Sequence, residues 1–246
     1  MTTARESSEL DERSIAGGIP SRALMQRAGA AAAGEIARLV RAAPHGTVVI
    51  FAGSGNNGGD GWVVARALGA AGVRVEVIAV GETRTADARA ERELAESEPL
   101  VSVVSLDDRE RAAPSGATGI VVDALLGTGA KGAPHEPAAT AIARIAQLRE
   151  WGATIVSLDI PSGVDADTGS SDGAVRADVT LTFGTVKRGL LVARAAAGRV
   201  VLLDIGLVRA TELDVSSVMP DRGAPYPTLV DGRWLRSVIP PFTADA

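Results

Sequence analysis

The sequence predicts an α/β fold in which helices cover both faces of a mostly parallel sheet, a three-layer αβα sandwich. Short β-branched runs that are apolar almost throughout alternate with helical segments, which is typical of parallel strands buried on both faces. Polar or glycine-rich segments follow four of these runs directly. A chain of 246 residues with 46% hydrophobic content can bury one large core, so we expect one principal domain.

The elements follow from apolar periodicity, taken in chain order. Residues 10–41 predict two N-terminal helices, separated near Gly17-Gly18-Ile19-Pro20, because apolar residues recur on one face of the second. That face carries Leu24, Met25, Ala28, Ala32, Ile36, Leu39 and Val40. Strands are predicted over residues 48–51, 73–80, 101–104, 120–122, 154–158, 179–183 and 200–203. Further helices are predicted over residues 61–71, 85–96 and 136–151.

The C-terminal segment has a different composition. Five of the 27 residues from Pro220 to Ala246 are proline, and the hydrophobic periodicity fades there. We therefore expect a main domain over residues 1–219, followed by a Pro-rich linker or the start of a truncated second domain over residues 220–246.

Composition excludes several classes of function. The net charge is −5 and the basic residues form no stripe, so we expect no nucleic-acid partner. No uninterrupted apolar run is long enough to span a bilayer, and the polar N-terminus lacks the apolar core of a signal peptide, so we expect no membrane partner and a cytoplasmic location. The chain has no cysteine, which rules out thiol nucleophiles and thiolate zinc sites.

The segment from Gly53 to Gly61 carries the strongest local signal. It has a G-x-G-x-x-G pattern after a strand and before a helix, and glycines let the backbone approach a ligand closely. Asp60 would repel a phosphate in the same turn, which favours a ribose hydroxyl group, a cation or a helix cap as its partner. Asn56 and Asn57 offer amide donors and carbonyl oxygens. A ligand loop and a plain Asn/Gly turn both fit this pattern.

Carboxylates at two strand ends indicate the chemistry. Asp123 and Asp159 each end an apolar strand, where a buried acid is costly unless it is paired, hydrogen-bonded or coordinating. Because parallel strands bring their carboxyl ends to one edge, Asn57, Asp123 and Ser162 could hold a hard, monovalent cation. Asp159 is then the candidate for proton transfer.

Other catalytic groups are less well supported. The two histidines, His45 and His135, lie in Pro- and Gly-flanked turns, and we expect His135 to be exposed. Ser162 is not the nucleophile of a G-x-S-x-G elbow, because Ile160 stands where that motif has glycine. No P-loop motif is present.

On these residues the sequence resembles the NAD(P)H-hydrate epimerase family over roughly residues 10–208. The matching segments are Gly18–Gly29, Asn56–Gly61, Asp123–Gly129, Asp159–Asp165 and Ala177–Lys187. The resemblance implies a Rossmann-like sandwich that forms a homodimer, binds hydrated NADH or NADPH and uses a potassium ion. One departure is Gln26, where the family usually has glutamate.

Carried over by position, the resemblance implies roles for named residues. Asn57, Asp123 and Ser162 would hold potassium, and Asp159 would be catalytic. The residues expected to contact the substrate are Asn56, Asn57, Gly58, Gly59, Asp60, Gly127, Thr128, Gly129, Ala130, Lys131, Gly132, Ala133 and Asp159.

The activity implied by the resemblance is interconversion of the R and S hydrates of NADH and NADPH, a repair of damaged cofactors. In fused members of the family, the chain would hand over near residue 220 to a nucleotide-dependent dehydratase, so we expect the first half of a bifunctional repair enzyme. Two other interpretations remain. Glu82, after the second strand, could bind a ribose in an NAD(P)-dependent dehydrogenase, and a non-catalytic dinucleotide-binding protein could keep the same pocket.

Overall fold

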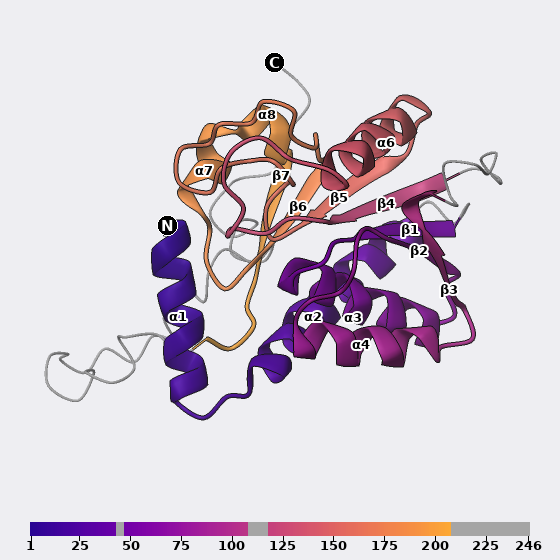
Figure 1. The fold of residues 1–246 in the computed structure, drawn as a ribbon, viewed down its shortest axis with the longest axis horizontal. Coiled ribbons are helices and arrows are strands. Elements are labelled where there is room, and N and C mark those ends of the chain that lie inside the picture. Colours follow the sequence, from indigo (N-terminus) through magenta and orange to yellow (C-terminus); the bar gives the residue numbers. More distant parts are fainter. Residues whose placement is uncertain (43–46, 108–117, 208–246) are drawn as a thin grey trace, which may run out of the picture. The chain divides into compact units, whose positions relative to one another are not determined.

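The computed structural model describes residues 1–42, 47–107 and 118–207, and these form a single parallel sheet with helices on both faces (Figure 1). The strand order is β3-β2-β1-β4-β5-β6-β7, and every pair of neighbours is parallel. The strands are β1 (Thr47–Ala52), β2 (Val75–Ala79), β3 (Val101–Ser105), β4 (Thr118–Ala124), β5 (Thr154–Leu158), β6 (Val179–Phe183) and β7 (Arg199–Leu203). The predicted αβα sandwich is confirmed.

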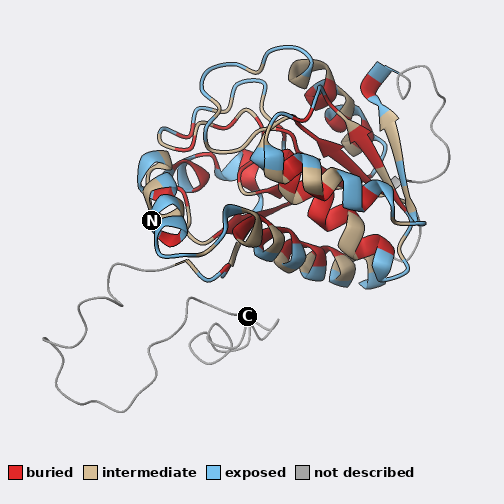
Figure 2. Ribbon diagram, turned by 60° about the horizontal axis from the view of Figure 1, so that its bottom comes forward, coloured by how far each residue is buried: buried red, intermediate tan, exposed pale blue. Residues whose placement is uncertain are grey.

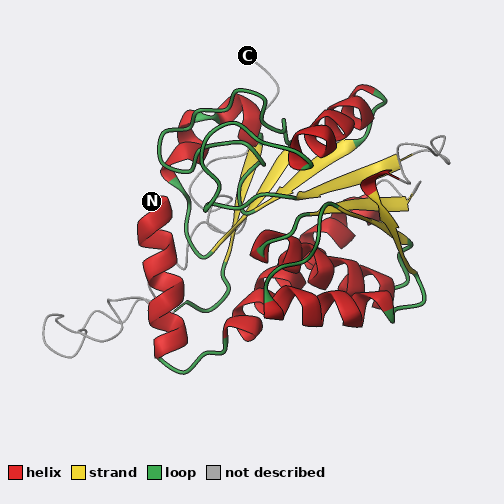
Figure 3. Cartoon of the chain, viewed as in Figure 1, coloured by secondary structure: helices red, strands yellow, loops and turns green. Residues whose placement is uncertain are grey.

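The helices form the two outer layers. One face of the sheet is covered by α2, α3 and α4, and the other by α6, α7 and α8, while α1 lies beside the sheet (Figures 1 and 3). Their bounds are α1 (Ala4–Ala16), α2 (Ser21–Ala42), α3 (Asn56–Ala70), α4 (Ala86–Glu96), α6 (Ala138–Glu150), α7 (Arg188–Val192) and α8 (Arg194–Ala197). The predicted break between the first two helices is present.

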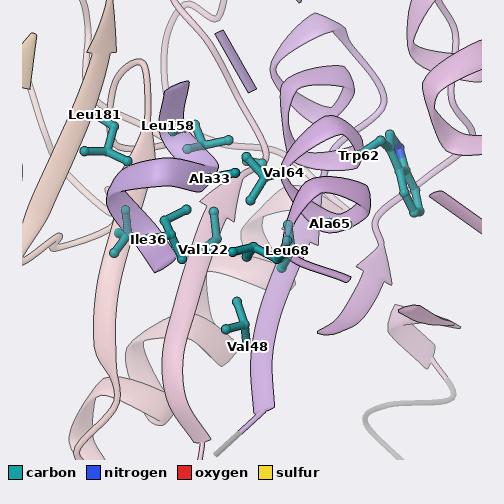
Figure 4. Close-up of a cluster of buried hydrophobic side chains, with 14 of the residues drawn as sticks. Ala33, Ile36, Val48, Trp62, Val64, Ala65, Leu68, Val122, Leu158 and Leu181 are labelled. Carbon is teal, nitrogen blue, oxygen red and sulfur yellow. The ribbon is translucent and has the colours of Figure 1, made fainter. Parts of the chain in front are cut away.

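Alternation along β1 shows why the sheet needs both layers. Val48 and Ile50 join the apolar cluster under α2 and α3, whereas Val49 and Phe51 join the cluster under α6. Strands β1, β5 and β6 are buried almost throughout, as are the inner helix faces, whereas the edge strands β3 and β7 are half-buried or exposed (Figure 2). Figure 4 shows the first cluster, in which side chains of β1, β4, β5 and β6 meet those of α2 and α3.

Two helix starts differ from the prediction. Helix α3 begins at Asn56, so most of the glycine-rich segment is helix rather than loop, and its N-cap is Gly55 rather than Asp60. Helix α1 begins at Ala4 because Thr3 and Glu6 form a capping box. The short helices α7 and α8 were not predicted, because five and four residues are too few for a helical period to show.

Two of the sequence predictions fall outside the described residues. These are the boundary between residues 219 and 220, and the turn expected around His45. Among the helices that the structure describes, none is both long and apolar enough to cross a membrane.

Candidate active site

A cavity of about 610 Å³ lies at the edge of the sheet where the strands end. The strand order reverses between β1 and β4, and this reversal is where open α/β sheets bind ligands. Residues that follow β1, β4, β5 and β6 line the cavity together with α1. Hydrogen bonds from Thr2 N to Val186 O (3.0 Å) and from Arg188 N to Thr2 O (2.9 Å) anchor the start of α1 to this edge.

An ion pair between Asp159 and Lys187 lies in the wall of the cavity. Lys187 is 1% exposed, and its Nζ donates to Asp159 Oδ1 at 2.5 Å and to the Phe183 carbonyl oxygen at 3.0 Å. Asp159 Oδ1 also accepts a hydrogen bond from Phe183 N at 3.2 Å. Asp159 has φ of 62° and is the only non-glycine residue with positive φ in the part of the chain that the structure describes. Such backbone conformations are enriched at functional sites.

Two further carboxyl groups line the same cavity, Asp60 from α3 and Asp11 from α1. Burial raises the pKa of Asp60 well above its ordinary value, the negative charges of Asp159 and Asp11 add to this, and the charge of Lys187 opposes it. Burial also raises the pKa of Asp11, with Lys187 opposing and Asp159 adding. Three acids and one buried ammonium group therefore share one region of the cavity wall.

The residues proposed for the cation lie together, as the strand ends predict. Asp123 is fully buried: Oδ1 accepts from Ser162 Oγ at 2.5 Å, and Oδ2 accepts from Ser162 N and Ser157 Oγ, each at 2.8 Å. Burial raises the pKa of Asp123, and the hydrogen bonds from Ser162, Ser157 and Leu125 oppose that shift.

Asn57 completes this group. Its amide nitrogen donates to Leu126 O at 3.1 Å, whereas its buried Oδ1 has no hydrogen-bond partner within the described residues. Leu126 N in turn donates to Ser162 Oγ at 2.9 Å, so the main chain of Leu126 links Asn57 to the Asp123–Ser162 pair. Buried polar atoms are normally satisfied, so the unpartnered oxygen of Asn57 is a candidate ligand for a hard cation. No group of three His, Cys, Asp or Glu side chains suitable for a metal occurs among the described residues, and this group contains only one carboxylate.

The predicted substrate contacts divide into two sets. Those that line the cavity are Asn56, Asn57, Asp60, Gly127, Thr128, Gly129, Ala130 and Asp159. Those that do not are Gly58, Gly59, Lys131, Gly132 and Ala133; Asp123 and Ser162 are buried and also do not line it.

Residues of the second set have other contacts. Lys131 Nζ pairs with Asp167 Oδ2 at 3.1 Å and is largely exposed. An ideal Cβ on Gly59 would lie 2.5 Å from Met25 Cε, so this glycine permits close contact between α3 and α2. His135 is exposed, as predicted.

Sequence reasoning missed the roles of Lys187 and Asp11. Lys187 could have been found, because it follows a buried strand by four residues and so falls at the same edge as Asp159. Asp11 had no such signal, since its place depends on how α1 packs.

Gln26 lies outside the cavity, in contact with a buried carboxylate. Its Nε2 donates to Glu91 Oε1 at 2.7 Å. Glu91 is fully buried and also pairs with Arg22 at 2.7 Å and Arg66 at 3.3 Å. An amide at position 26 thus supplies a donor to Glu91, which a glutamate in the same place would not.

A family model described as "YjeF-related protein N-terminus" matches residues 21–189. The chain belongs to this family. It is 38% identical over 227 residues to an NAD(P)H-hydrate epimerase from Pirellula staleyi, an alignment that covers 88% of this chain and 96% of that protein. It is also 38% identical over 206 residues to a bifunctional NAD(P)H-hydrate repair enzyme Nnr from Hyperthermus butylicus, covering 80% of this chain.

The chain spans 37% of the Hyperthermus butylicus protein, and 42% of a second bifunctional relative from Archaeoglobus fulgidus. The crystal structure of a yeast protein, ynu0, has the same fold as this chain. The two structures superpose with a TM-score of 0.71 at 24% sequence identity, over 83% of this chain and 87% of the yeast chain. Glu82, on which the dehydrogenase interpretation depends, is exposed and does not line the cavity of this family member.

Proposed function

We propose that this chain interconverts the R and S hydrates of NADH and NADPH. The observation that carries the proposal is the Asp159–Lys187 ion pair in the wall of the cavity. A relative that aligns with this chain over 96% of its own length is named as an epimerase of these hydrates. The ion pair keeps a carboxylate at the strand edge where this fold binds dinucleotides.

The chemistry of the hydrate explains why carboxyl groups suit this cavity. The hydroxyl group stands on the ring carbon beside the ring nitrogen, so its loss leaves an iminium cation, and return of water to the other face gives the epimer. An acid assists the departure and a base assists the return. Asp11, Asp60 and Asp159 line the cavity, so carboxyl groups that can give or accept a proton face the space where the hydrate would bind.

We propose that Asn57, Asp123 and Ser162 hold a potassium ion. The support is the buried, unpartnered Oδ1 of Asn57, together with the hydrogen bonds of Leu126 that link Asn57 to Ser162 and so to Asp123. A monovalent ion polarises its ligands weakly compared with divalent metals, so its contribution would be to order the loops after β1 and β4 and to offset charge.

The partners proposed for the chain follow from its relatives. Several relatives are named as bifunctional repair enzymes and are more than twice as long as their match to this chain, so we propose that the epimerised S hydrate passes to a nucleotide-dependent dehydratase, fused or separate. We also propose a homodimer in the cytoplasm, which size-exclusion chromatography with light scattering and cell fractionation would test.

The activity is tested by chromatographic separation of the R and S hydrates. Pure R hydrate incubated with the protein should reach the equilibrium mixture faster than without it, with no nucleotide added. Pure S hydrate should reach the same mixture. No acceleration in potassium buffer would contradict the proposed function, and oxidation or reduction of the cofactor would favour a dehydrogenase.

Asp159→Asn should lower the epimerisation rate by about a hundredfold or more, the scale expected for loss of one acid–base group. The amide keeps the size of the side chain, so substrate affinity should change little. We would measure kcat and KM with both hydrates, beside a thermal melt of the variant. Near-normal turnover in the folded variant would contradict the role of Asp159.

A further inference from the structure

Two carboxyl groups in the cavity wall are held in different ways. Asp159 is paired with the Lys187 ammonium group at 2.5 Å and accepts a hydrogen bond from Phe183 N. Asp60 lines the same cavity from α3, yet its carboxyl group forms no hydrogen bond or ion pair with any residue in the ranges 1–42, 47–107 and 118–207. A half-buried carboxylate without a partner is costly, whereas the neutral acid is not.

The charges that face Asp60 come from three other elements. Asp11 lies on α1, Asp159 follows β5, and Lys187 is the N-cap of α7. Together with burial, the two carboxylates raise the pKa of Asp60, and Lys187 alone opposes them. Arg84 and Asp87 are the other charged residues that line the cavity among the described residues. Asp60 therefore keeps its proton to higher pH than an exposed aspartate does.

Epimerisation by loss and return of water needs a group of each kind. The C–O bond breaks when the hydroxyl oxygen receives a proton and leaves as water, while the lone pair on the ring nitrogen forms the C=N bond of the iminium. In the second step the oxygen of a water molecule bonds to the same carbon, the C=N electron pair returns to nitrogen, and the water gives up a proton. A neutral acid and a carboxylate in one cavity meet both needs.

We propose that Asp60 is a second catalytic residue, the acid that protonates the departing hydroxyl group, and that the Asp159 carboxylate accepts the proton of the incoming water. The proposal rests on the epimerase function proposed above. Each conversion of one hydrate into its epimer therefore leaves Asp60 without its proton and Asp159 with one more. The opposite epimerisation, or proton exchange with solvent, restores the starting state.

The test is the pH dependence of R-to-S and S-to-R conversion in the wild type, Asp60→Asn, Asp60→Glu and the control Asp172→Asn. Asp172 is an exposed loop aspartate outside the cavity. Asp60→Asn should lower kcat by about a hundredfold or more in both directions. Its KM should stay within about threefold of wild type, because a transition-state interaction is lost. The fall of wild-type kcat/KM at alkaline pH should disappear in Asp60→Asn, Asp60→Glu should recover part of the rate, and Asp172→Asn should behave as wild type.

The outcomes separate the two proposals. A wild-type protein without epimerisation would contradict the proposed function itself. An active wild type whose Asp60→Asn variant keeps its rate within threefold, or keeps the alkaline fall, would overturn the role of Asp60 alone. The amide removes no hydrogen bond, so Asp60→Asn should melt no lower than wild type. If Asp60→Asn does not fold, the pH dependence of kcat/KM in Asp60→Glu is the test. A fall of kcat/KM at the same alkaline pH as in the wild type would overturn the proposal.

Discussion

Gly58 and Gly34 are both helical glycines, and replacing each with alanine should have opposite effects on stability. Gly58 lies in the first turn of α3, where an ideal Cβ would be 2.7 Å from the Gly53 carbonyl carbon and closer still to its oxygen. Gly34 is exposed within α2, and nothing lies within 4 Å of its ideal Cβ. Both positions gain from alanine in helix propensity, by about 1 kcal/mol.

The difference in free energy of unfolding follows from the contact at Gly58. Overpacking costs about 1–3 kcal/mol, and the cost should be near the upper value here because a main-chain carbonyl cannot rotate away as a side chain does. Subtracting the gain in helix propensity leaves Gly58→Ala about 2 kcal/mol less stable than wild type. For a domain of this size, 1 kcal/mol corresponds to about 2–4 °C in Tm. We therefore expect Gly58→Ala to melt about 4–8 °C lower, and Gly34→Ala about 2–4 °C higher.

The assay is thermal unfolding followed by circular dichroism at one protein concentration and one potassium concentration, because bound ions shift Tm. Gly58→Ala melting at or above the wild-type temperature would refute the assignment of Gly58 to packing. It would leave substrate contact, the role expected from the resemblance, as the explanation for this glycine. A lowered Tm in Gly34→Ala would refute the helix-propensity part of the calculation.

Three further predictions concern the cation group, Asp60 and Gln26. Potassium should raise the wild-type Tm relative to a bulky organic cation, because an ion bound only by the folded state stabilises it. Asn57→Ala should abolish this difference in Tm. The same wild-type Tm in both cations would contradict the cation site. The raised pKa of Asp60 means that its contribution to stability is greatest below the unfolded-state pKa and is lost as pH rises through the folded-state pKa. Asp60→Asn should therefore gain more in Tm over wild type at pH 8 than at pH 5, and an equal gain would contradict the shift. Gln26→Glu should lower the free energy of unfolding by about 1–3 kcal/mol, because it removes a hydrogen-bond donor to buried Glu91 and adds a like charge. Gln26→Met adds no charge and should lower it less. A larger loss of stability in Gln26→Met than in Gln26→Glu would contradict the role of Gln26 as a donor to Glu91.

The order of residues along the chain is enough to specify the sheet and the edge at which the site lies. Apolar runs such as Thr154–Leu158 specify strands buried on both faces, since the alternation of side chains depends only on neighbouring backbone. Once parallel strands were predicted, Asp123 and Asp159 had to end at one edge, because every strand in such a sheet points the same way. The proximity of Asn57, Asp123 and Ser162 followed from this.

The pairing of the side chains at that edge depends on how the chain packs in three dimensions. Lys187 and Asp159 are 28 residues apart, and Asp11 reaches the cavity because α1 is anchored to the segment before α7. The same holds for Gly58: its sequence pattern suggests a ligand loop, but in the folded chain a side chain at this position would meet the main chain of Gly53. Periodicity and turn chemistry are local, whereas ion pairs, an unpartnered carboxyl group such as that of Asp60, and close contacts between main chains depend on packing between distant segments. A sequence pattern alone does not specify that packing.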